Sequence, residues 1–190
     1  MSVRLPVWIV LSLSCSLVAA ALAPGERAPK DGPGPAAEAP VRPSATAARA
    51  VFERLKGLEG EWRGRSTMGW KDEVRFDVIA RGSVVMESSR FEAHPGETMV
   101  TMFHMDGDRL LLTHYCVAGN QPRLEASAIA DGGAHVSFTF ADATGIASRD
   151  AGHMDSVELF FEEGALRSVW SWYQDGASRP MEEIRLERAD

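Results

Sequence analysis

The chain has 190 residues, of which 45% are hydrophobic and 25% are charged, and its formal net charge at pH 7 is −7. This length is typical of about one globular domain with a substantial core. The acidic balance and the lack of a basic stripe argue against nucleic acid as a partner, because phosphate binding needs clustered Lys and Arg.

Residues 1–23, MSVRLPVWIVLSLSCSLVAAALA, are typical of a secretory signal peptide. Arg4 precedes an apolar run that contains serines and ends in small residues, and we expect cleavage after Ala21 or Ala23. The run is too short and too rich in serine for a permanent membrane span. We therefore expect an exported protein, periplasmic or secreted. A lipoprotein anchored at Cys15 is an alternative that the preceding residues fit poorly.

Loss of this leader removes one basic and no acidic residue, so the net charge changes from −7 to −8. It also leaves Cys116 as the single cysteine, so the fold must depend on packing and not on an internal disulfide. Residues 24–45 are rich in Pro, Ala and Gly without an apolar period, which predicts a disordered linker. Residues 46–190 are expected to form a single domain.

A short helix is predicted over residues 46–56, because Val51, Phe52 and Leu55 fall on one helical face. Gly57 is expected to end this helix in the left-handed conformation. The favoured role of the helix is to pack against the domain that follows.

After Gly60, short runs of alternating and β-branched residues are separated by turns that contain glycine. The predicted strands cover residues 61–67, 73–80, 83–92, 98–105, 109–116, 123–130, 135–141, 155–162, 166–174 and 179–188. Because so many successive hairpins leave no room for helical crossovers, the strands must pair antiparallel. Roughly ten such strands would leave open edges as a flat sheet, so we expect an all-β fold: an up-and-down barrel large enough to enclose a cavity.

Alternation along the strands predicts which side chains face the interior. The expected inward sets are Val136, Phe138 and Phe140; Val157, Leu159 and Phe161; and Leu166, Trp170 and Trp172. The same parity extends inward to Asp142, His153 and Asp155 at strand ends, near a barrel mouth.

The richest segment is TMVTMFHMDGDRLLLTHYCVAGNQPR, residues 98–123, with a hairpin turn expected at Asp106-Gly107. Both faces of this hairpin are mixed, so the pattern does not decide which one is interior. We favour the face that carries His114 and Cys116, because Phe103, Leu110 and Leu112 accompany them.

The residues Gly60-Glu61-Trp62, after a helix and before an antiparallel barrel, resemble the calycin group of lipocalins, fatty-acid-binding proteins and nitrobindin-like barrels. In lipocalins, the tryptophan of this motif closes the barrel floor beneath an arginine of the last strand. The resemblance implies that Arg185 or Arg188 covers Trp62 as a cation-π lid.

The run MFHMDGDRLLLTHYCVAGNQPR, with FTFADAT and GHM further on, also resembles exported bacterial proteins of uncharacterised function, of the DUF1579 type. This resemblance implies a lipocalin-like barrel and supplies no reaction. The resemblance to nitrobindin-like haem barrels is looser, and none of the five histidines matches a haem ligand. Haem therefore stays an alternative, and no cofactor is predicted.

The polar and reactive residues of the sequence can have either a chemical role or a structural one. Cys116 follows His114 at a same-face spacing, but no base-orienting partner is identifiable, so an inert cysteine is favoured over a nucleophile. The histidines show no close ligand spacing, and no metal site is predicted. Gln121 and Arg123 are favoured as parts of a structured turn, with binding of a ligand carboxylate as the alternative.

The leading hypothesis is a non-enzymatic barrel that binds a small apolar or amphipathic ligand. Met99, Phe138 and Phe140 would line its cavity. The predicted ligand-binding residues are His114, Cys116, Gln121, Arg123, Asp142, His153, Trp170 and Trp172.

Two alternatives stay open. One is an enzyme or cofactor protein that uses His114, His153 and Asp142 for proton transfer, which requires these groups within hydrogen-bonding reach of a substrate. The other is a tethered interaction domain, which would expose apolar patches in place of a cavity.

Overall fold

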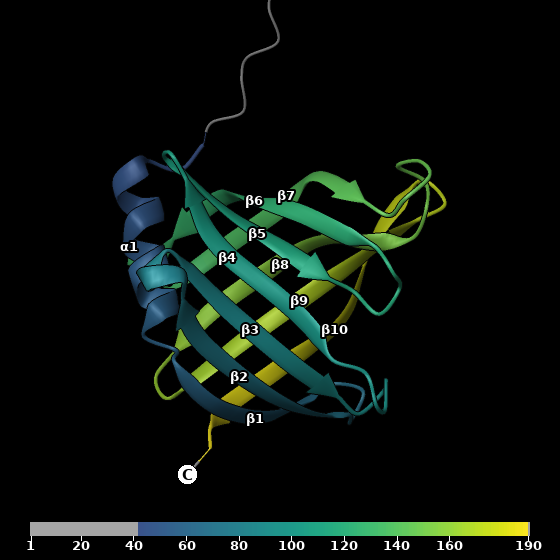
Figure 1. Cartoon of the computed structure of the whole chain (residues 1–190), viewed down its shortest axis with the longest axis horizontal. Helices are drawn as coiled ribbons and strands as arrows, with labels where there is room; N and C mark the ends of the chain where they lie inside the picture. The colour runs from purple at the N-terminus through teal and green to yellow at the C-terminus, as the bar shows by residue number, and fades with distance from the viewer. Residues whose placement is uncertain (1–41, 190) are drawn as a thin grey trace, which may run out of the picture. The chain divides into compact units, whose positions relative to one another are not determined.

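The structure is a computed structural model that describes residues 42–189, and these residues form a barrel of ten strands preceded by one helix (Figure 1). The predicted leader and most of the predicted linker lie outside the described residues, so those predictions stay predictions. Helix α1 covers Ala45–Lys56 and begins at Ser44, whose hydroxyl accepts a hydrogen bond from the backbone N–H of Ala47 at 3.2 Å.

The strands follow one another with short connections. They are β1 (Gly60–Ser66), β2 (Lys71–Ile79), β3 (Val84–Phe91), β4 (Met99–Asp106), β5 (Arg109–Tyr115), β6 (Gln121–Ala130), β7 (His135–Thr144), β8 (His153–Glu162), β9 (Ala165–Gln174) and β10 (Ala177–Arg188). Single 3-10 turns, η1 (Ala80–Gly82) and η2 (Asp131–Gly133), connect β2 to β3 and β6 to β7.

Each strand pairs antiparallel with its neighbours in the sequence, and β1 pairs with β10 to close the barrel. The predicted fold class, an all-β antiparallel barrel with a preceding helix, is therefore confirmed. Closure needs a glycine at position 64, opposite Leu186, because a Cβ atom there would lie 1.9 Å from the carbonyl oxygen of Arg185. No other residue lets the first and last strands approach this closely.

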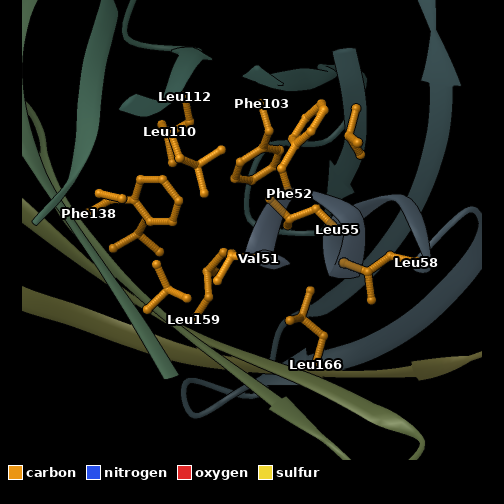
Figure 2. Packing of buried hydrophobic residues seen from close by; sticks show 14 of the residues in the cluster. Val51, Phe52, Leu55, Leu58, Phe103, Leu110, Leu112, Phe138, Leu159 and Leu166 are labelled. Carbon is orange, nitrogen blue, oxygen red and sulfur yellow. The ribbon is translucent and has the colours of Figure 1, made fainter. Parts of the chain in front are cut away.

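One end of the barrel is sealed by α1. The guanidinium of Arg49 donates to the carbonyl of Gly107 at 3.1 Å, and Val51 packs against Gly133 of η2, so the helix lies beside the connections β4–β5 and β6–β7. Figure 2 shows the apolar face of the helix among side chains of the strands. The labelled residues are Val51, Phe52, Leu55, Leu58, Phe103, Leu110, Leu112, Phe138, Leu159 and Leu166.

Trp62 on β1 joins this sealed end to the last strand. Its indole N–H donates to the carbonyl of Leu58 at 2.7 Å, and the Arg188 guanidinium lies over its ring, 4.8 Å from the centroid. Arg188 also donates to the carbonyls of Gly57 and Glu59, at 2.6 and 3.0 Å. Of the two arginines that the sequence left open, Arg188 is thus the lid over Trp62.

Two local predictions are wrong. Gly57 has φ −64° and is right-handed, because its N–H still bonds to the carbonyl of Glu53 at 3.2 Å in a continuing helical turn. The β4–β5 turn is Gly107-Asp108, one residue later than expected, since Asp106 pairs with Arg109. Gly107 has φ +60°, a conformation that favours glycine. Neither difference changes which side chains face inward.

Candidate functional site

The interior of the barrel divides into a packed half next to α1 and a cavity of about 960 Å³ at the other end. On β5, Leu110 and Leu112 are buried in the packed half, whereas His114 and Cys116 line the cavity. Side chains two residues apart on a strand share a face, so the inward face of β5 contributes both to the packed half and to the cavity wall. The interior of the central hairpin is therefore the face that carries His114, as favoured from the sequence.

The volume of this cavity suits a drug-sized molecule, since ligand pockets are typically about 300–1,000 Å³. Much of its wall is apolar, and the large apolar side chains come from β3, β4, β8, β9 and β10. They include Phe91, Met99, Met154, Trp170, Trp172, Met181 and Ile184.

The indole of Trp172 is held in place by close packing. A Cβ atom at Gly152 would lie 2.6 Å from this ring, so the glycine lets the loop before β8 pass directly beside the indole. Its N–H donates to the side chain of Gln174 at 3.1 Å. These contacts fix the orientation of one aromatic wall before any ligand enters.

Three carboxyl groups from different strands also line the cavity: Asp72 on β2, Glu87 on β3 and Glu182 on β10. Asp72 is 4% exposed and accepts a hydrogen bond from the Ser89 hydroxyl at 2.7 Å. Burial raises the pKa of Asp72, the Ser89 hydrogen bond opposes this rise, and the charge of Glu182 adds to it. One oxygen of Glu182, Oε2, is buried and has no hydrogen-bond partner among the described residues.

Glu87 begins a polar chain across three neighbouring strands. It lies opposite Thr101, which lies opposite His114, and the Thr101 hydroxyl bonds to Glu87 and lies 3.0 Å from Nδ1 of His114. Burial raises the pKa of Glu87 to about 8, the charge of Asp72 adds to this rise, and the Thr101 bond opposes it. The uncharged form of Glu87 is therefore favoured at neutral pH.

His114 is the last member of this series of hydrogen-bonded side chains, and it is 5% exposed. Its ring lies against Trp170, with centroids 4.9 Å apart, and its Nε2 is buried without a hydrogen-bond partner among the described residues. Burial lowers the pKa of His114 to about 4, so the imidazole is neutral at physiological pH. The residue also lines the cavity, so an unpaired nitrogen belongs to its wall.

Four of the eight predicted binding residues line the cavity: His114, Cys116, Trp170 and Trp172. The Cys116 sulfur accepts the backbone N–H of Ala118 at 3.5 Å, and burial raises the pKa of its thiol. A raised pKa disfavours the thiolate that a nucleophile needs.

Three other predicted residues lie outside the cavity. Arg123 and Asp142 form an ion pair with both side chains about half exposed, and Gln121 accepts a hydrogen bond from the Thr144 hydroxyl at 2.7 Å. The prediction that Asp142 faces inward is wrong, because Leu124 lies opposite Phe140 while Arg123 lies opposite Asp142. The extra residue in β7 is Ala141, a bulge that reverses the alternation.

His153 is fully buried, but it does not line the cavity. Its ring lies between Phe140 and Tyr173, at centroid distances of 4.7 and 5.4 Å. Nε2 contacts the Arg149 guanidinium, and Nδ1 lies 2.5 Å from the carbonyl of Ala151. A bulge at Asp155 reverses the alternation of β8, so that Met154 and not His153 reaches the cavity.

The alternative constellation for proton transfer is therefore not assembled. His114 faces the cavity, His153 is enclosed by aromatic rings and Arg149, and Asp142 is paired with Arg123 on the outer surface. Among residues 42–189, no group of three or more His, Cys, Asp and Glu side chains is arranged to hold a metal ion. Within the same residues, no helix has the length and apolar character needed to cross a membrane.

The polar residues that sequence reasoning missed are those on the inward faces of β2, β3 and β10. On β3, Val85 and Phe91 are buried in the interior, so the alternation VVMESSRF also turns Glu87 and Ser89 inward. This signal was readable in the sequence. The inward position of Glu182 was not, because a bulge between Pro180 and Glu182 shifts the register of β10.

No family model matches this sequence, and no curated protein sequence matches it. Among solved structures, the fold is similar to a protein of unknown function of the DUF3598 family from Nostoc punctiforme PCC 73102, with a TM-score of 0.48 and 13% sequence identity. The match covers 71% of this chain and 49% of that chain, so this chain spans about half the length of the Nostoc protein. The DUF1579 resemblance is corrected, because no family model matches the chain.

Proposed function

We propose that this protein is an exported barrel that binds a small molecule and does not catalyse a reaction. The observation that carries the proposal is the unfilled cavity of about 960 Å³, walled by Trp170 and Trp172. A barrel that served only as a scaffold would gain dispersion and hydrophobic energy by filling this volume with side chains. The expected leader peptide supports a site of action outside the cytoplasm.

Burial of an apolar ligand against this wall supplies the driving force for binding. Each Å² of apolar surface removed from water contributes about 25 cal/mol. The fixed indole of Trp172 limits the entropy lost on binding, because a preorganised wall needs no further ordering. The cavity is thus suited to an amphipathic molecule with an apolar body.

The first test is native mass spectrometry of the protein purified from its host, compared with the mass after denaturation. We expect a mass excess that disappears on denaturation. The matched variants are Ser168→Phe, which fills the cavity, and Ser171→Phe, on the outer face of the same strand. The first should lose the excess, and the second should keep it.

A mass excess retained by both variants would place the ligand outside this cavity. A bare mass for the unmodified protein would contradict tight carriage of a ligand.

A further inference from the structure

We propose that the cavity selects ligands that carry a protonated amine on an apolar or aromatic body, and that Asp72, Glu87 and Glu182 hold the ammonium group. The inference rests on the proposed binding function and adds the chemical class of the ligand. It begins from the contrast between carboxyl groups inside and outside the barrel.

Several outer carboxylates are paired with arginines, for example Asp106 with Arg109 and Glu162 with Arg167, and those that are unpaired are exposed to water. Among the ion pairs of residues 42–189, none includes Asp72, Glu87 or Glu182. A buried carboxylate without a counter-ion is costly. A cationic ligand would supply the charge that the described part of the protein does not.

The unpaired nitrogen of His114 points to the same ligand. When Glu87 is ionised, the Thr101 hydroxyl donates its single proton to the carboxylate, so it must accept from Nδ1–H of His114. Nε2 then carries a lone pair that has no donor among the described residues, on a side chain that lines the cavity. An ammonium group brings three N–H donors and no acceptor, which matches a set of acceptors.

The aromatic wall adds a second attraction. Trp170 lies beside His114, and Trp172 lies on the same inward face of β9. A cation over an indole face is attracted by the negative face of the ring. One arginine of the described residues, Arg179, also lines the cavity; it is exposed, lies opposite Trp172 on the mouth side of Glu182, and forms no ion pair with the three carboxyl groups.

Binding of a cation should release a proton. The charge of Asp72 from β2 acts directly on Glu87, while Thr101 from β4 is uncharged. The other titratable groups that line the cavity are Glu182 and Arg179 from β10, His114 from β5, and His94, Glu97, Cys116 and Asp175 from the connections at its mouth. The raised pKa of Glu87, about 8, keeps this carboxyl largely protonated in the empty protein at pH 7. An ammonium beside it favours the ionised form, so affinity should rise with pH between 6 and 8.

Isothermal titration calorimetry with three probes of equal shape tests this selection. The probes are 2-(1-naphthyl)ethylamine, 2-(1-naphthyl)ethanol and the 1-naphthylacetate anion, each titrated at pH 7 and at pH 8 in two buffers of different ionisation enthalpy. We expect the amine to bind at least about tenfold more tightly than the alcohol, since a hydrogen bond between charged groups is stronger than one between neutral groups. The carboxylate should bind most weakly, and at pH 7 the buffer comparison should show proton release for the amine alone.

Variants locate the selection within the cavity. Glu87→Gln and Asp72→Asn should each weaken amine binding about tenfold and leave alcohol binding unchanged. Unchanged alcohol binding also reports that each variant is folded. The control is Glu73→Gln, which removes an exposed carboxylate next to Asp72 on the outer face of β2 and should change neither affinity.

The outcomes separate the two proposals. Equal binding of all three probes, or tighter binding of the carboxylate, would overturn amine selection and leave the binding function standing. Amine preference that survives both cavity variants would also overturn it. Failure of every probe to bind at millimolar concentration would overturn the binding function together with the amine selection.

Discussion

Glu87, Thr101 and His114 are linked by hydrogen bonds. The ionisation of Glu87 and the protonation of His114 give the stability of the folded protein opposite dependences on pH. A carboxyl group with a raised pKa stabilises the folded protein most at pH values below its unfolded pKa, and this stability is lost as the pH rises to its folded pKa. A histidine with a lowered pKa does the reverse, since its stability is lost as the pH falls from its unfolded to its folded pKa. Glu87 changes between 4.5 and about 8, and His114 between 6.5 and about 4.

The first prediction concerns the pH dependence of the free energy of unfolding. Between pH 4.5 and 6.5 the two slopes oppose each other, so the fall in stability should be clearest from pH 6.5 to 8, at most about 1.4 kcal/mol per pH unit. Glu87→Gln should flatten this segment, because the amide does not titrate. Urea unfolding at several pH values measures the slope. Parallel curves for the variant and the unmodified protein would contradict the assignment.

The second prediction concerns the protonation of His114. Because burial lowers its pKa to about 4, its ring protons should show no titration of the imidazole between pH 5.5 and 7 in NMR spectra. A smaller shift near pH 8 should follow the ionisation of Glu87 through Thr101. This second shift should disappear in Thr101→Val, which removes the connecting hydroxyl. A His114 titration near 6.5 would show that water reaches the ring freely.

At the scale of elements, the closure of β1 on β10 depends on a single close approach. The third prediction is that Gly64→Ala lowers the free energy of unfolding by about 3 kcal/mol or more, because the new methyl group would overlap the backbone of Arg185. Chemical denaturation measures the loss. The control is Gly69→Ala in the β1–β2 turn, where nothing lies within 4 Å and only the positive φ of +89° opposes the change. It should cost about 1 kcal/mol, and equal losses would contradict the argument from closure.

The fourth prediction concerns the lid over Trp62. Arg188→Ala removes a cation-π contact and two hydrogen bonds to carbonyls after α1, so it should destabilise the protein by about 1–3 kcal/mol. Arg185→Ala, on the same strand, removes ion pairs with Glu162 and Glu187 on the outer surface and should cost less than about 1 kcal/mol. Urea unfolding compares the two. A larger loss for the Arg185 variant would contradict the assignment of the lid.

The strands and the helix could be predicted from the sequence because each strand shows alternating apolar and polar residues. Alternation and glycine turns located all ten strands to within a few residues, together with the helix. Bulges leave no such mark, because an extra residue such as Ala141 or Asp155 looks like any other strand residue. Parity counted across a bulge therefore placed Asp142 and His153 on the wrong face.

At the scale of the whole molecule, the barrel has no free edge. The fifth prediction is that amide protons of β1 and β10 exchange with deuterium as slowly as those of β5 and β6, because every strand has two neighbours. Connections at the cavity mouth should exchange quickly. Mass spectrometry of exchanged peptides measures these rates. Fast exchange limited to β1 and β10 would show that the barrel opens there.

The cavity could be anticipated only in part. Ten strands around a closed barrel already predict more interior than side chains fill, and His114, Trp170 and Trp172 were placed in it from the sequence. The carboxyl groups come from β2, β3 and β10, and the register that brings Glu182 beside Trp170 depends on a bulge. The three carboxyl groups lie in one cavity only because the barrel closes, and no single segment of the sequence shows this.

Because the barrel has a sealed end and an open end, mutations that change the cavity mouth fall in different residues from mutations that change the core around α1. In an up-and-down barrel the connections alternate between the ends, so residues 67–70, 92–98, 116–120, 145–152 and 175–176 all lie at the mouth, opposite α1. Insertions in these connections leave the core around α1 untouched. New specificity can therefore be acquired at one end while the other end keeps the chain folded, which makes this barrel a suitable scaffold for directed evolution of binders.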